Sequence, residues 1–155
     1  MKILEVYTDG AASPNPGKGA WAYCIVDVKK PIVIQSGYQR HATCNQMEMQ
    51  AVIEALKAIK NKGLSDCYIY LHTDSQYVQR GITEWIDKWI ENGWKSSTGA
   101  VKNIKLWKEI INLSNDMKIH YQWVRGHSGN KWNEFVDKLC SEEITKQIKK
   151  EANNG

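Results

Sequence analysis

Two aspartates in this chain follow strand-like apolar runs, and each is followed by a small residue. The run 3–8 leads into Asp9 and the run 68–73 leads into Asp74, with a helix-like segment between them. Strand, helix and strand in that order predict a right-handed crossover that pairs the two strands in parallel, with both carboxylates at one edge of the sheet. Neighbouring carboxylates repel unless a proton or a cation lies between them, and Mg²⁺ prefers oxygen ligands of this kind. The pair therefore predicts a metal-dependent reaction.

Three further side chains have the type and position to join this pair. Glu48 lies near the start of a helix expected over about 43–62, on the same stripe as its apolar residues. Alone it is more simply a first-turn acid favoured by the helix dipole, but beside two aspartates we interpret it as a ligand. Asp137 borders the apolar face of the last helix, where a solvated acid is the simpler interpretation. His127, in a glycine-flanked loop, is either a proton shuttle near pH 7 or a surface histidine.

The elements that must position these residues follow an α/β pattern. Short connections join the first three expected strands and favour an antiparallel meander, with a turn cluster over 10–19. The expected strands are 3–8, 20–28, 32–38, 68–73 and 118–124, and the expected helices are about 43–62, 75–91, 102–113 and 131–149. Residues 1–150 are expected to form one domain, and 151–155 a frayed polar tail.

Composition sets the broad class of the protein. The chain has 155 residues and a net charge of +4, which permits a nucleic-acid partner but is also a device for solubility. Its four cysteines show no metal-finger spacing and are interpreted as free thiols in a reducing cytoplasm. No apolar run has the length of a membrane span, and the first residues lack a signal-peptide core. We expect a cytoplasmic monomer with no membrane partner.

Short motifs in a fixed order and spacing extend over nearly the whole chain. They are Tyr7-Thr8-Asp9-Gly10, Asn15-Pro16-Gly17, Asn45-Gln46-Met47-Glu48, Thr73-Asp74-Ser75-Gln76, Gly93-Trp94-Lys95, Gly126-His127-Ser128-Gly129, and Asn133-Glu134 with Asp137. Each motif is weak alone, but together they are highly specific. The chain resembles type 1 ribonuclease H, the family that cuts the RNA strand of RNA–DNA hybrids.

The resemblance implies a ribonuclease H-like fold, with a five-stranded mixed sheet of order 3-2-1-4-5 flanked by helices. It also implies that Asp9, Glu48, Asp74 and Asp137 bind two Mg²⁺ ions, with Mn²⁺ as a substitute metal and with His127 beside them. Two ions about 4 Å apart activate a water and stabilise the departing 3′ oxygen. The implied products carry 5′-phosphate and 3′-hydroxyl ends.

Substrate contacts are also implied by the resemblance. The residues implied to read the 2′-hydroxyls of RNA are Asn15, Asn45 and Gln76. Those implied to hold a DNA phosphate are Arg40, Thr43 and Asn103. The spacing around Arg40 is one residue longer than usual in the family. The segment 85–108 holds four tryptophans and five lysines and corresponds to a basic protrusion that docks the hybrid. Its expected contacts are Lys88, Trp89, Lys95 and Lys102. The simpler interpretation is a helix hairpin with its own tryptophan core.

Other functions would leave different marks on the sequence. A hybrid-binding module without catalysis would lose carboxylates, and all four are present. Related folds for DNA strand transfer or exonuclease proofreading also use clustered acids, but they predict neither the loop around His127 nor the basic protrusion. This chain departs from the family pattern at Cys44, where the family often has asparagine.

Overall fold

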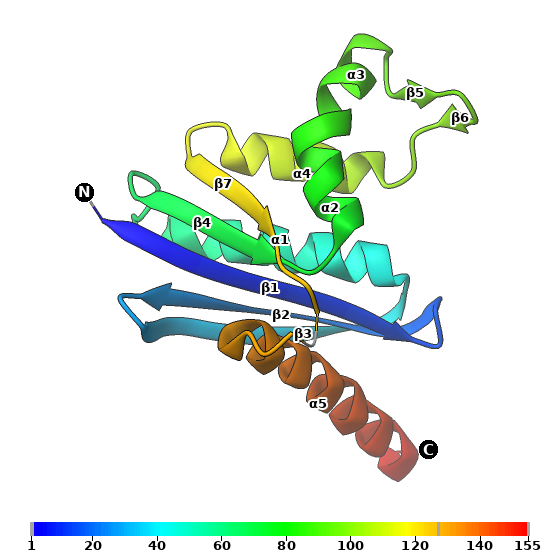
Figure 1. Ribbon diagram of the computed structural model, residues 1–155. Helices are drawn as coiled ribbons and strands as arrows, with labels where there is room; N and C mark the ends of the chain where they lie inside the picture. The colour runs from blue at the N-terminus through cyan, green and yellow to red at the C-terminus, as the bar shows by residue number, and fades with distance from the viewer. Residues whose placement is uncertain (1, 127, 155) are drawn as a thin grey trace.

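A five-stranded mixed sheet lies at the centre of the protein, with strand order β3-β2-β1-β4-β7 (Figure 1). In this computed structural model the described residues are 2–126 and 128–154. The strands are β1 (Ile3–Ser13), β2 (Gly17–Asp27), β3 (Lys30–Ala42), β4 (Tyr68–Thr73) and β7 (Lys118–Trp123). β1, β2 and β3 pair antiparallel, whereas β4 pairs in parallel with both β1 and β7. The predicted order is confirmed, with β7 as the fifth strand of the sheet.

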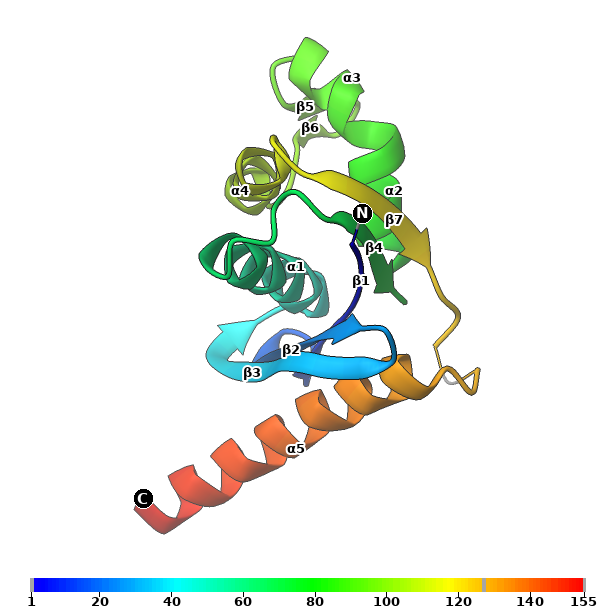
Figure 2. The same ribbon diagram turned by 90° about the vertical axis from the view of Figure 1, so that its left-hand side faces the viewer.

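Two helices cover opposite faces of this sheet (Figure 2). Helix α1 (Cys44–Asn61) buries Val52 and Leu56 against Leu4 and Ile25, and α4 (Ile104–Ser114) lies beside it. Helix α5 (Lys131–Asn154) buries Val136 and other residues against the opposite side of β1 and β2. Because successive side chains of a strand point to opposite faces, β1 and β2 contribute to both cores.

The ends of α1 are set by local sequence. The hydroxyl of Thr43 accepts from the backbone N–H of Gln46, while the Gln46 side chain accepts from the backbone N–H of Thr43. This reciprocal capping box satisfies two backbone donors that a helix start leaves free. After the last turn, Gly63 adopts φ +71°, a left-handed conformation that glycine tolerates. The predicted helix is therefore confirmed at both ends.

The protrusion is built from short pieces. The expected helix 75–91 is divided into α2 (Gln76–Arg80), a π-helical turn η1 (Gly81–Trp85) and α3 (Ile86–Glu91). A Cβ on Gly81 would lie 2.1 Å from the ring of Trp107, so glycine is needed for the fully buried Trp107 to pack there. A small hairpin of β5 (Lys95–Ser96) and β6 (Gly99–Ala100), not predicted from sequence, follows.

Two expectations about loops were wrong. The segment 10–19 is not a turn cluster, because Ala11 pairs with Ala20 and the turn is confined to residues 14–16. The tail after residue 150 is helical as far as Asn154. Its Glu151 forms an ion pair with Lys18 at 2.6 Å and accepts a hydrogen bond from Tyr38 at 2.9 Å. Among the described residues, no helix is both long and apolar enough to cross a membrane.

Candidate active site

Three carboxylates from three separate elements converge at the centre of the sheet. Asp9 lies within β1, Glu48 in α1, and Asp74 directly after β4. One carboxylate oxygen from each lies within 4.8 Å of the others. The parallel register explains the approach of the aspartates, because Thr8 and Thr73 are the last paired residues of β1 and β4. The expected proximity of Asp9 and Asp74 is confirmed, although β1 continues past Asp9 as a partner of β2 alone.

Glu48 reaches the aspartates because α1 packs unusually close to β1. A Cβ on Gly10 would lie 2.2 Å from the backbone nitrogen of Glu48 and from the carbonyl carbon of Met47, so only glycine fits. At this contact the backbone N–H of Gly10 donates to Oε1 of Glu48 at 3.1 Å. The glycine after Asp9 therefore places the third carboxylate, a role that sequence reasoning did not assign to it.

Asp74 is held by its neighbours on β7 and α5. The indole N–H of Trp123 donates to the backbone oxygen of Asp74 at 3.0 Å, and the backbone N–H of Val124 donates to Thr73 at 2.9 Å. Burial raises the pKa of Asp74, and the nearby amide of Asn133, only 2% exposed, opposes this shift by lowering that pKa. Neither Trp123 nor Asn133 was predicted as a site residue, but Asn133 lies one helical turn before Asp137, and that spacing was a usable signal.

Asp137 reaches the same region from α5. It is half-buried, and its negative charge raises the pKa of both Asp9 and Asp74. Asp137 is not part of the tight group of three oxygens, so the structure places the fourth predicted ligand beside the cluster.

The electrostatics of the cluster are unfavourable without a cation. The pKa of Asp9 is raised, first by burial and then by the charges of Glu48 and Asp74. Burial followed by the charge of Asp74 likewise raises the pKa of Glu48, and burial raises that of Asp74. Oε2 of Glu48 is buried without a hydrogen-bond partner among the described residues. A divalent cation with oxygen ligands fits this site, since it would satisfy the orphaned oxygen and relieve the repulsion.

The predicted RNA-reading residues lie around the first turn of α1 and the start of α2. Oδ1 of Asn15 accepts from the backbone N–H of Cys44 at 3.1 Å, which ties the β1–β2 turn to α1. Asn45 and Gln76 are exposed. His127 lies outside the described residues.

A hollow of about 550 Å³ between α1 and the protrusion contains four of the predicted substrate-binding residues. Its lining residues are Asn45, Tyr77, Trp89, Ser96, Thr98, Ala100, Val101, Lys102 and Asn103. Lys88 and Lys95 are exposed elsewhere on the protrusion. The ring of Trp89 lies 5.4 Å from that of Trp107, so the protrusion also has the tryptophan core of the simpler interpretation.

Arg40 and Thr43 differ in how the structure places them. Thr43 caps α1, and its capping partner Gln46 hydrogen-bonds Asn103. Arg40, in β3, lies near Glu151, where it adds to the lowering of the Glu151 pKa that hydrogen bonds from Lys18 and then Tyr38 produce. The structure therefore brings Thr43 close to Asn103, while Arg40 is exposed near Glu151 at the end of α5.

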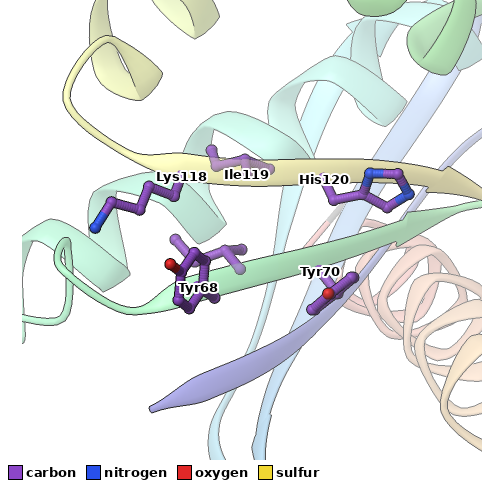
Figure 3. A pocket seen from close by; sticks show the side chains of 6 residues that line it. Tyr68, Tyr70, Lys118, Ile119 and His120 are labelled. Carbon is purple, nitrogen blue, oxygen red and sulfur yellow. The ribbon is translucent and has the colours of Figure 1, made fainter. Parts of the chain in front are cut away.

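A second, smaller hollow of about 240 Å³ lies at the other end of β4 (Figure 3). Its residues are Tyr68, Ile69, Tyr70, Lys118, Ile119 and His120. Tyr68 is the first residue of β4, whereas Asp74 follows the last one, so this hollow is separated from the carboxylates by the length of the strand. Its described lining residues include no acid, so it lacks the metal-ligand types that the cluster around Asp9 offers.

Comparison with known proteins agrees with this geometry. Residues 1–145 match the family model described as RNase H. The ribonuclease H of Wolbachia sp. subsp. Drosophila simulans (strain wRi) is 47% identical over 146 residues, which cover 92% of this chain and 96% of the relative. The type 1 enzyme LC9-RNase H1 has a TM-score of 0.80 at 28% identity, over 95% of this chain and 74% of that one. LC11-RNase H1, crystallised with an RNA/DNA hybrid, has a TM-score of 0.76 at 21% identity, over 94% and 99% of the two chains.

The fold, the convergent carboxylates and the sequence identity lead to the same conclusion. A relative that is 47% identical over nearly the full length of both chains identifies the family, which a similar sheet alone would not do. The chain belongs to the ribonuclease H family.

Proposed function

We propose that this protein is an endonuclease that hydrolyses the RNA strand of RNA–DNA hybrids with Mg²⁺, leaving 5′-phosphate and 3′-hydroxyl ends. The observation that carries the proposal is the group formed by Asp9, Glu48 and Asp74, whose oxygens lie within 4.8 Å of one another. The name ribonuclease H of the relative at 47% identity, and the RNA/DNA hybrid in complex with LC11-RNase H1, support the choice of substrate.

Asp9, Glu48 and Asp74 would hold the metal, with Asp137 beside them. When bound, two such ions activate a water and stabilise the leaving oxygen of an in-line displacement at phosphorus. The chain contributes the geometry: Gly10 fixes Glu48 against β1, and Trp123 and Asn133 fix Asp74. The hydrogen bond from Gly10 to Glu48 is buried, so the packing of α1 against β1 would hold this carboxylate in place for the metal. His127 is proposed as a proton carrier beside them, on the strength of its position between β7 and α5.

Selection of a hybrid requires contacts to both strands. RNA offers 2′-hydroxyls in a wide, shallow minor groove, and we propose that Asn15, Asn45 and Gln76 read them. The hollow beside the protrusion is suited to the DNA backbone, because its described lining residues include Lys102 and several hydrogen-bond donors and no carboxylate. Asn45 also lines this hollow, so the residues proposed for the two strands would meet at the start of α1.

Cleavage assays on end-labelled duplexes test this function. Hybrid, duplex RNA and duplex DNA of one sequence are incubated with the protein in Mg²⁺, in Mn²⁺ and in chelator. The proposal expects internal cuts in the RNA of the hybrid only, with Mg²⁺ or Mn²⁺ and not with chelator. Cleavage of duplex DNA at a similar rate, or cleavage in chelator, would contradict it.

A further inference from the structure

The side chain of Asn103 is held at the edge of the hollow by two hydrogen bonds from different elements. Its Oδ1 accepts from Nε2 of Gln46 in α1 at 3.4 Å, and its Nδ2 donates to the hydroxyl of Tyr77 in α2 at 3.1 Å. Asn103 precedes α4 and adopts φ +60°, but its side chain makes no capping bond to that helix. A non-glycine residue in this region is uncommon, and here it directs the amide toward α1 and α2.

The hydrogen bonds of the Gln46 side chain determine which way the side-chain amide of Asn103 points. Oε1 of Gln46 accepts from the backbone N–H of Thr43 at 3.0 Å, which leaves its NH₂ group to face Asn103. That NH₂ group requires an acceptor, so the carbonyl oxygen of Asn103 must face Gln46 and its NH₂ must face the other way. A primary amide carries two N–H donors, and the bond to Tyr77 uses one of them. Among the described residues the second N–H of Asn103 has no hydrogen-bond acceptor, and Asn103 lines the hollow.

We propose that Gln46 is a positioning residue that orients Asn103 so that an N–H donor, and not the carbonyl oxygen, faces the DNA strand. This inference rests on the proposed function, since it assigns a role in binding the hybrid. The occupant is a phosphodiester group, because the hollow combines the Asn103 donor with the cation Lys102 and its described lining residues include no carboxylate. Reversal of the Asn103 amide would present an acceptor to an anion and weaken binding.

The substitution Gln46→Glu separates this role from the role of Gln46 in folding. Glutamate still accepts from the Thr43 N–H and is the favoured partner in a capping box, and an acid in the first turn suits the helix dipole. It lacks the NH₂ group, so the Asn103 oxygen loses its donor and faces a carboxylate instead. Gln50→Glu is the matched control, because it adds the same charge one turn further along α1, where Gln50 contacts Glu54.

The experiment measures kcat, KM and the melting temperature, with equilibrium binding of a labelled hybrid in Ca²⁺. Gln46→Glu should raise KM and the hybrid Kd about 10-fold, the loss of a hydrogen bond to a charged group. Its kcat at saturating hybrid should stay within about twofold of the wild-type value, and its melting temperature should not fall. Gln50→Glu should leave KM within about twofold of wild type. An unchanged KM in Gln46→Glu would overturn the proposal.

A double-mutant cycle shows whether Gln46 acts through Asn103. If it does, Gln46→Glu should add almost nothing to KM in an Asn103→Ala background. The same 10-fold effect in both backgrounds would mean direct repulsion of the phosphate by the new charge, and the positioning role would be rejected. Failure of the proposed function would look different, because the wild-type protein itself would not cleave the hybrid.

Discussion

Gly10→Ala is expected to impair catalysis by moving one carboxylate away from the other two. The new Cβ would lie 2.2 Å from backbone atoms of Met47 and Glu48, whereas ordinary van der Waals contact begins at 3.4 Å. Backbone atoms in a helix cannot rotate away, so α1 and β1 must separate by about 1 Å, a misplacement that can reduce turnover about 10²-fold. The separation also breaks the hydrogen bond from Gly10 to Glu48.

Gly10→Ala should also lower the stability of the fold. Overpacking of a close contact destabilises a fold by about 1–3 kcal/mol, so the variant should remain folded at 25 °C. Urea denaturation gives the change in the free energy of unfolding, and cleavage of saturating hybrid in Mg²⁺ gives kcat. Gly63→Ala is the control, because Gly63 has φ +71° and no atom within 4 Å of its Cβ position. Alanine at position 63 should lower the free energy of unfolding by about 1 kcal/mol without affecting turnover.

The two glycine variants are expected to differ in turnover although both are destabilised. Loss of turnover in Gly10→Ala with normal turnover in an equally destabilised Gly63→Ala would show that geometry, and not stability, is responsible. If Gly10→Ala retained kcat within about twofold of wild type, the close approach of α1 to β1 would have no part in placing Glu48.

Three other variants address charge, docking and proton transfer. Burial and neighbouring carboxylates raise the pKa of Asp9 above its unfolded value, so the contribution of Asp9 to the free energy of unfolding falls as the pH rises above about 4. In chelator, Asp9→Asn should therefore raise the free energy of unfolding by about 1 kcal/mol or more at pH 7 and leave it unchanged near pH 3. The same variant should lose almost all turnover in Mg²⁺. A lower free energy of unfolding at pH 7 would refute the repulsion between the carboxylates. Replacing Lys88, Lys95 and Lys102 by alanine should raise KM and flatten its salt dependence with kcat nearly unchanged, because counterion release drives docking; an unchanged salt slope would reject the docking role. His127→Ala should lower turnover about 10²-fold without abolishing it, and equal rates at every pH would make His127 a bystander.

The part of the site that sequence predicted is the part encoded by strand and helix periodicity. Asp9 and Asp74 could be brought together because parallel pairing aligns the ends of 3–8 and 68–73. Glu48 could be added because it shares a helical stripe with buried residues such as Val52. These are local patterns joined by one topological rule, the right-handed crossover.

What sequence missed depends on contacts between distant segments. Residues 10–13 are small and weak in strand propensity, yet they continue β1 because β2 pairs with them. Glu151 lies near Arg40 although it is 111 residues away in sequence, and no pattern around Arg40 indicates this neighbour. The close contact between Gly81 and Trp107 joins the π-helical turn to α4, and no pattern within 75–91 indicates it.

The same limit applies to the groups that support the carboxylates. Trp123 donates a hydrogen bond to the backbone of Asp74, and Asn133 lowers the pKa of its carboxyl; such roles cannot be assigned before the partner is known. Gln46 is similar, because its capping function is readable from the spacing Thr43–Gln46, whereas its bond to Asn103 spans 57 residues.

A crystal structure of the protein with an RNA–DNA hybrid and Ca²⁺, which supports binding without efficient turnover, tests the central claim most directly. The account predicts Ca²⁺ bound to the carboxylates of Asp9, Glu48 and Asp74, with a phosphate of the RNA strand against the ion. The DNA strand should lie with a phosphate in the hollow beside Asn103. Ions bound elsewhere, or a DNA phosphate at the carboxylates with the RNA strand in the hollow, would contradict the account.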